Sequence, residues 1–327
     1  MNDRVAFIDT SKGIGILMVV YQHVLFALIP NALIVHRSYE VITSFHMPLF
    51  FILSGYFWSN KSDLKSFVSK KIKTLLIPFG CFYIFTSYGL GKLAQIYGIS
   101  LSNNECNWDD FISKESFPNG PIWFLLSLFI ACCYYYVINR IGRKWLIVSF
   151  LSVTIGFGGY LCFRLNVNLP MFLDTSMVGC LFLWIGNAMG KVNLLSKLNA
   201  SYWLILILGI ITYLCAPYVV MMVNAYSGSF LVFVLTSITG TLFVSIMSKK
   251  ISCDKLNYYG RYSIIILCTH NVIVSLGSLL VKKVTDIFLI QFLCVFASVI
   301  ILEYFVIYLI RNYIPFVVGL SKVSEIK

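Results

Sequence analysis

The amino-acid sequence predicts an all-α protein that crosses a membrane about ten times. Of its 327 residues, 59% are hydrophobic and only 12% are charged, whereas water-soluble domains are about half apolar and about a quarter charged. The mean hydropathy is +0.86. A net charge of +12 would suggest a nucleic-acid partner in a soluble protein. Here the basic residues lie in short segments between apolar runs, as membrane topology requires, so we expect no nucleic-acid binding.

Ten apolar runs have the length that a hydrocarbon core of about 30 Å requires at about 1.5 Å per residue. They lie near residues 12–30, 42–59, 74–97, 121–139, 145–163, 169–190, 202–222, 229–247, 262–281 and 287–310. The sixth run begins with polar residues, so nine or eleven spans are alternatives. No stretch is typical of a water-soluble domain. We therefore expect residues 1–327 to form a single integral-membrane domain.

The positions of lysine and arginine predict the orientation. Of the 25 basic residues, 19 fall on the side of the N-terminus when the spans alternate. Six lie on the other side: Arg37, Lys92, Lys114, Arg164, Lys282 and Lys283. Because cytoplasmic segments carry the excess of basic residues, both termini are predicted to be cytoplasmic. The ten cysteines show no metal-ligand spacing such as CxxC, and we expect no metal site.

Polar residues inside the apolar runs are the candidates for function, because they are costly in a membrane. The first two runs carry His23 and His46, and the last two carry His270 and Glu303. Counted from the cytoplasmic ends at about 1.5 Å per residue, their depths are roughly 16, 20, 12 and 12 Å. All four depths lie in the middle of the bilayer. A single central polar cavity is therefore geometrically permitted.

The protonation state of such histidines determines their chemistry. Burial disfavours the charged imidazolium, so a histidine at this depth tends to be neutral and able to accept a proton from a hydroxyl group. A carboxylate such as Glu303 near His270 would oppose this tendency. Lys12 stands at the cytoplasmic mouth, eleven positions before His23, where it is placed to hold an entering anionic group.

Several stretches carry a family resemblance. DTSKGIGILMVVYQH, which contains Lys12 and His23, is followed by FHMPLFFILSGYFW, KSFVSKKIKTLLIPF, GPIWFLLSLF and YYGRYSIIILCTHN. This order resembles acyltransferase family 3, and most of all its fucose 4-O-acetylase-like branch. The resemblance implies a multi-pass enzyme of a bacterial cell (plasma or inner) membrane. It would transfer an acetyl (acyl) group from acetyl-coenzyme A to a sugar hydroxyl of a cell-surface polysaccharide or its lipid-linked precursor.

The resemblance also assigns roles to residues. His23 matches the family's essential histidine and Lys12 its basic partner, which is usually arginine; the lysine keeps the charge but loses the bidentate grip on phosphate. We expect the acceptor to be bound by His46, Trp123, His270 and Glu303. We expect the donor's phosphates to be bound by Lys70, Lys71, Lys73 and Arg261. Acetyl-coenzyme A would be a co-substrate, with no permanently bound cofactor, and an acyl-histidine intermediate is an alternative to general-base catalysis.

Each of these residues also has a structural interpretation. His46 and His270 can bond to a neighbouring helix backbone, and Glu303 can pair with a cation or a hydroxyl between helices. Trp123 can mark the membrane interface, and the lysines near residue 70 can be topology signals alone. Ser54-Gly55 can let two helices approach closely, the alternative being a nucleophilic Ser54.

Two other classes of function stay open. One is a proton-coupled transporter or flippase of a polar glycan-related substrate, in which the intramembrane histidines and Glu303 would relay protons. The other is a non-catalytic partner in a membrane assembly.

Overall fold

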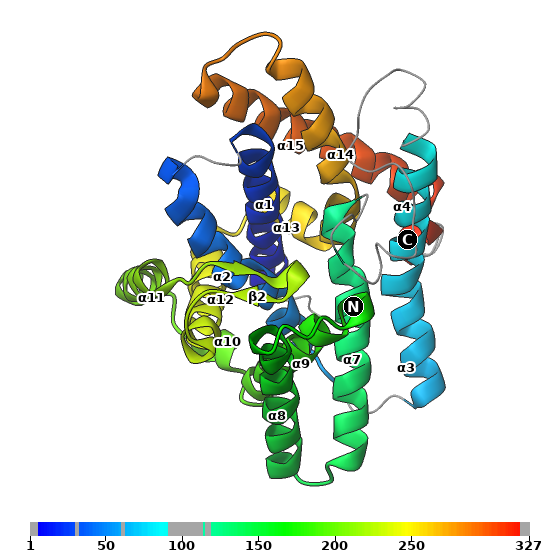
Figure 1. The fold of residues 1–327 in the computed structure, drawn as a ribbon, viewed down its shortest axis with the longest axis vertical. Coiled ribbons are helices and arrows are strands. Elements are labelled where there is room, and N and C mark those ends of the chain that lie inside the picture. The colour runs from blue at the N-terminus through cyan, green and yellow to red at the C-terminus, as the bar shows by residue number, and fades with distance from the viewer. Residues whose placement is uncertain (1–5, 30–32, 60–62, 91–113, 115–118, 321–327) are drawn as a thin grey trace.

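The computed structural model describes residues 6–29, 33–59, 63–90, 114 and 119–320, and these are almost entirely helical (Figure 1). The long helices are α1 (Ala6–Leu28), α2 (Leu33–Tyr56), α7 (Trp123–Ile141), α8 (Trp145–Arg164), α9 (Leu173–Lys191), α11 (Tyr202–Cys215), α12 (Phe230–Ile251), α14 (Ser263–Val281) and α15 (Phe288–Tyr313). Shorter helical segments are α3 (Leu64–Lys71), η1 (Ile72–Leu76), α4 (Ile77–Ile84), η2 (Phe85–Leu90), η3 (Gly120–Ile122), η4 (Pro170–Phe172), α10 (Leu194–Lys197), η5 (Met221–Val223), α13 (Asp254–Arg261) and η6 (Pro315–Val318). Two short strands, β1 (Val219–Val220) and β2 (Ala225–Tyr226), pair antiparallel.

The predicted all-α polytopic membrane fold is confirmed. Within the described ranges, seven helical stretches are long and apolar enough to span a membrane. They are Ala6–Leu28, Gly120–Ile141, Trp145–Arg164, Pro170–Lys191, Phe230–Ile251, Ser263–Val281 and Phe288–Tyr313. The predicted span 74–97 corresponds to η1, α4 and η2 as far as residue 90, and its remainder lies outside the described residues.

Two predicted boundaries are wrong. The second span is predicted to begin near residue 42, but α2 begins at Leu33. No glycine or proline interrupts residues 33–43, so nothing stops the helix there. The span predicted at 202–222 ends early, because α11 stops at Cys215. Pro217 disfavours the helical conformation of the residue before it, and the chain continues into the β1–β2 hairpin.

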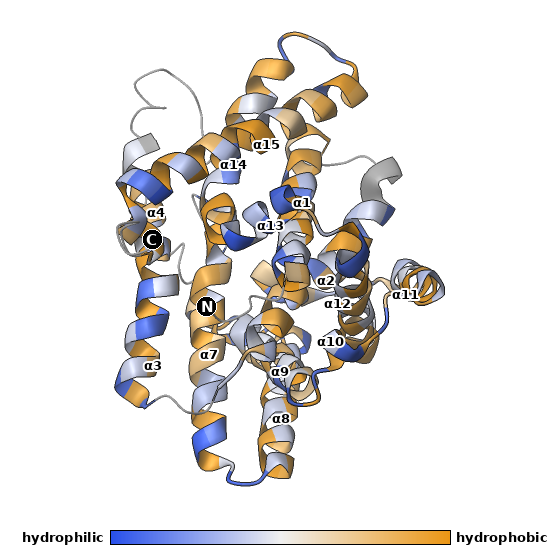
Figure 2. Ribbon diagram, turned by 180° about the vertical axis from the view of Figure 1, so that it is seen from behind, coloured by the Kyte–Doolittle hydropathy of each residue, from blue (hydrophilic) through white to orange (hydrophobic). Residues whose placement is uncertain are grey.

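The helices divide into an inner and an outer set. In the apolar windows of α9, α7 and α1, 72%, 61% and 56% of the residues are buried, against 28% in α15 and 22% in α8. The exposed faces of the outer helices are apolar; on α15 they include Leu302, Phe305 and Leu309. Figure 2 shows apolar residues along most of α7, α12 and α15, whereas α13 is largely polar. Such extended apolar surfaces suit contact with lipid rather than water.

Small residues let α2 and α9 approach closely. A Cβ atom added at Gly55 of α2 would meet the backbone of Leu183, and one added at Gly186 of α9 would meet the backbone of Ile52. Close approach through small residues is a common way for membrane helices to associate. The close approach expected at Ser54-Gly55 is thus present, and the Ser54 hydroxyl donates to the carbonyl of Phe50 at 2.7 Å.

A proline inside α2 creates a further contact between helices. Pro48 has no N–H, so the carbonyl four residues earlier, that of Ser44, lacks its helical partner. The hydroxyl of Ser237 on α12 donates to this carbonyl at 2.9 Å, in a buried position. Because a freed backbone group inside a membrane protein needs a new partner, this bond fixes α12 against the middle of α2.

We expect Ser237→Ala to lower the free energy of unfolding by about 1–2 kcal/mol, because it leaves the buried Ser44 carbonyl unpaired. Unfolding of the purified protein in mild detergent measures the change. Ser245→Ala is the matched control: it lies on the same helix and is buried, but its hydroxyl makes no hydrogen bond with any described residue. Equal losses in the two variants would contradict the role given to Ser237.

Candidate active site

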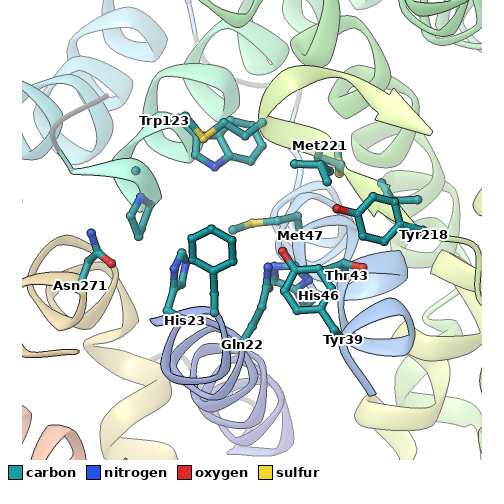
Figure 3. Close-up of a pocket in the computed structure, with 16 residues that line it drawn as sticks. Gln22, His23, Tyr39, Thr43, His46, Met47, Trp123, Tyr218, Met221 and Asn271 are labelled. Carbon is teal, nitrogen blue, oxygen red and sulfur yellow. The ribbon is translucent and has the colours of Figure 1, made fainter. Parts of the chain in front are cut away.

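A cavity of about 420 Å³ lies among α1, α2, the start of α7, the hairpin region and α14. Figure 3 shows His23 of α1 and His46 of α2 projecting toward it, with Trp123 and Met221 facing them. The lining residues are Gln22, His23, Phe26, Tyr39, Thr43, His46, Met47, Gly120, Pro121, Trp123, Tyr218, Val219, Val220, Met221, Met222 and Asn271. Two imidazoles, four aromatic rings and several hydroxyl and amide groups therefore share one space.

The hydrogen bond of His46 fixes which of its nitrogens can act in the cavity. Nδ1 lies 2.7 Å from the carbonyl of Ile42, in the same helix. A carbonyl only accepts hydrogen bonds, so Nδ1 carries the hydrogen and Nε2 presents a lone pair. The predicted bond to backbone exists, but within its own helix rather than to a neighbour. His46 still lines the cavity, so it can accept a hydrogen bond from a bound hydroxyl group.

Aromatic rings form the walls. The rings of Tyr39 and Tyr218 stack with centroids 6.1 Å apart. Trp123 is only 5% exposed and packs against Phe172 at 5.7 Å. A tryptophan so thoroughly packed is fixed inside the protein, which favours the wall of a binding site over a membrane-interface marker.

The hairpin beside the cavity is fixed by hydrogen bonds to two other helices, α8 and α9. Asn224, in the left-handed conformation at φ 55°, donates to the carbonyl of Gly159 on α8 at 2.9 Å and accepts from the hydroxyl of Tyr226. Thr175 of α9 donates to the carbonyl of Met221 at 2.9 Å. Tyr218 and Met221 of the hairpin region line the cavity without having been predicted. Pro217, which ends α11, is the sequence feature that indicates a break before them.

Next to Thr175 lies a fully buried ion pair. The ammonium of Lys114 contacts both carboxylate oxygens of Asp174 at 2.5 and 2.7 Å, and neither side chain is more than 1% exposed. Asp174 also accepts from the backbone N–H of Thr175. The pair thus connects the segment between α4 and α7 to the part of α9 that holds the hairpin.

Lys12 lines a second, smaller cavity of about 110 Å³. Its other lining residues are Ile16, Phe50, Ser54, Leu75, Phe124, Leu125, Leu128, Ser263, Ile264 and Leu267. The helices α1, α2, α7 and α14 contribute to both cavities. Adjacent residues of α7 line different cavities: Trp123 lines the first and Phe124 the second.

Comparison with known proteins identifies the family. The model of an acyltransferase domain family, acyltransferase family 3, matches residues 5–309. The chain belongs to acyltransferase family 3. It is also similar to a nodulation protein, NolL, of Mesorhizobium japonicum (strain LMG 29417), with 30% identity over 166 residues. That match covers 48% of this chain and 42% of the relative, so the chain spans less than half the relative's length. No solved structure matches.

The chain is thus a membrane protein of an acyltransferase family. Two residues predicted to bind the acceptor, His270 and Glu303, lie outside the first cavity. His270 is fully buried beside His23, with ring centroids 5.0 Å apart. Glu303 is buried and accepts from the hydroxyl of Thr269 at 2.8 Å, as the structural interpretation expects. Neither His270 nor Glu303 is among the described residues that line the cavity.

Four basic residues are predicted to bind the phosphates of the donor. None of them lines either cavity. Lys70 and Lys73 are exposed, and the ammonium of Lys71 lies 6.0 Å from the ring of Trp58. Arg261 is 46% exposed and 3.9 Å from Asp9. Lys73 lies two residues before Leu75, and Arg261 lies two residues before Ser263. Both Leu75 and Ser263 line the second cavity. Within the described ranges, no group of three His, Cys, Asp or Glu side chains could hold a metal ion.

We expect Lys114→Met to lower the free energy of unfolding by about 3–5 kcal/mol, because it leaves the Asp174 carboxylate buried without its cation. Thermal and denaturant unfolding in detergent measure this loss. In the double variant Lys114→Met/Asp174→Asn the charge is removed while Oδ1 still accepts from Thr175, so roughly half of the loss or more should be recovered. A double variant as unstable as Lys114→Met alone would contradict the electrostatic explanation.

Proposed function

We propose that this protein is an O-acyltransferase that moves an acetyl group from acetyl-coenzyme A to a hydroxyl of a sugar. The acceptor would belong to a cell-surface polysaccharide or its lipid-linked precursor, at a bacterial cell membrane. The observation that carries the proposal is the position of His23. It lines the larger cavity on the same helix that presents Lys12 to the smaller one, so two substrates can approach it from opposite ends of the bundle.

The smaller cavity suits the donor. Its walls are apolar apart from Lys12, Ser54 and Ser263, which matches the thin thioester arm of a coenzyme A. Lys73 and Arg261 flank it in the sequence, and with Lys12 they offer cations to the coenzyme's phosphates. In the orientation predicted from the sequence, with both termini in the cytoplasm, this cavity would face the compartment that contains acetyl-coenzyme A. The coenzyme would act as a co-substrate and not as a resident cofactor.

The larger cavity suits the acceptor. Its volume of about 420 Å³ lies within the usual range for small-ligand sites, about 300–1,000 Å³. The rings of Tyr39, Tyr218 and Trp123 can cover the apolar faces of a sugar, while Gln22, Thr43 and His46 can bond its hydroxyl groups. With the orientation above, this cavity belongs to the outer half of the protein, where surface polysaccharide is modified.

The reaction then follows from the residues present. A neutral ring nitrogen of His23 takes the proton from the acceptor hydroxyl as its oxygen attacks the thioester carbonyl carbon. A C–O bond forms and the C–S bond breaks, so the acetyl group passes to the sugar and the coenzyme leaves as a thiolate. The protonated His23 returns its proton to that sulfur. Each turnover therefore leaves His23 neutral again.

We expect His23→Ala to lower kcat by about 10²- to 10⁴-fold, because the general base is lost. Transfer of radiolabelled acetyl from acetyl-coenzyme A to membrane glycan, in proteoliposomes treated with a protonophore, measures it. Thr154→Ala, an exposed position on α8 whose hydroxyl bonds its own helix, should behave as the wild type. Proton-coupled movement of substrate without acyl transfer would replace this proposal with a transporter.

Lys12 should act on the donor and not on the sugar. We expect Lys12→Met to raise the KM for acetyl-coenzyme A about tenfold, because losing a charge-assisted bond costs about 1.5 kcal/mol, while the KM for the acceptor changes little. Lys12→Arg keeps the charge and should stay near the wild type. Initial rates measured with each substrate varied in turn separate the two constants. A rise in the KM for the acceptor alone would contradict the assignment of Lys12 to the donor.

A further inference from the structure

His270 is a buried imidazole that the reaction above does not use. It has no solvent exposure and does not line the acceptor cavity, although the next residue, Asn271, does. The nearby carboxylate of Glu303 accepts from Thr269. The ring of His270 instead lies beside that of His23, with centroids 5.0 Å apart and an angle of 59° between the planes.

The tautomer of His270 is set by its own helix. Nδ1 lies 2.6 Å from the carbonyl of Ile266, so Nδ1 carries the hydrogen and Nε2 is left with a lone pair. Nε2 is buried and makes no hydrogen bond with any described residue. A buried polar atom without a partner costs about 1–3 kcal/mol. Such an atom next to His23, the proposed general base, needs an explanation.

The distance between the two rings fits a hydrogen bond after a small rotation. Each ring nitrogen lies about 1.1 Å from its centroid and an N–H···N bond is about 2.9 Å long, so two bonded imidazoles have centroids about 5 Å apart. His23 is half-buried at the cavity wall, where its ring can turn. His270 is packed on all sides and tied to Ile266, so its lone pair stays in place.

We propose that Nε2 of His270 accepts the ring N–H of His23 and so makes His270 the positioning residue of the acyl transfer. This rests on the proposed function of His23. The bond holds His23 in the tautomer whose other nitrogen presents its lone pair to the acceptor cavity. When that nitrogen takes the hydroxyl proton, the positive charge that develops on His23 faces a preorganised acceptor. The proton stays on His23, and His270 remains neutral.

Two substitutions separate this role from others. His270→Gln keeps an amide oxygen within reach of the Nε2 position, whereas His270→Asn extends only as far as Nδ1. Partners that orient a functional histidine are typically worth about 10- to 100-fold. We therefore expect His270→Asn to lower kcat by that factor with both KM values nearly unchanged, and His270→Gln to restore most of the rate. A rise in the acceptor KM with kcat unchanged, or full activity in His270→Asn, would overturn the proposal.

A measurement on the wild type tests the bond without reference to turnover. Solid-state ¹⁵N NMR of histidine-labelled protein in lipid reports which ring nitrogen of His23 carries the hydrogen, and the signals lost in His23→Gln assign it. We expect one tautomer in the wild type and a mixture in His270→Asn. A mixture in the wild type would refute the positioning role even where acyl transfer is present. One tautomer without acyl transfer would refute the proposed function alone.

Discussion

His46 and His270 each place Nδ1 against the carbonyl four residues earlier in the same helix, at 2.7 and 2.6 Å. Inside an apolar bundle a neutral imidazole must find such a partner, because no water is available to bond its N–H. The consequence is chemical as well as structural. Both rings are fixed in one tautomer, in which Nε2 can only accept a hydrogen bond. His46 presents this nitrogen at the larger cavity, and the ring of His270 lies beside His23. Two nitrogen atoms in the middle of the protein can therefore accept hydrogen bonds. This arrangement suits a site that removes a proton from a hydroxyl group.

The helices around these histidines are positioned by similar needs for partners. Pro48 lies two residues after His46 and frees the carbonyl of Ser44, which Ser237 of α12 then binds at 2.9 Å. On another face of α2, Gly55 allows the backbone of α9 to approach. A single helix thus carries a cavity histidine, a proline that attracts one neighbour and a glycine that admits another. The placement of His46 follows from these two contacts.

Depth along the helix could be predicted from the sequence, but rotation about its axis could not. Counting residues places His23, His46, His270 and Glu303 at similar heights, and the first two do share a cavity with Trp123. Glu303 lies at a fitting height but points to Thr269. These helices are apolar on nearly all sides, so no polar face indicates which side looks inward. The hairpin was missed for another reason: its geometry depends on bonds from Asn224 to α8 and from Thr175 to Met221, which no local pattern reveals.

The division between the two cavities bears on the proposed reaction of two large substrates. On α14, Leu267 lines the smaller cavity and Asn271 the larger, a separation of about 6 Å along the helix. On α2, Phe50 and Met47 are about 4.5 Å apart. The rings of Phe50 and Phe124, with centroids 5.9 Å apart, lie at this division. Under the proposed reaction, rotation of these rings is the movement that would open a path from the smaller cavity toward His23. Under the proposed reaction the acyl group alone crosses, and neither the coenzyme nor the sugar has to pass through the bundle.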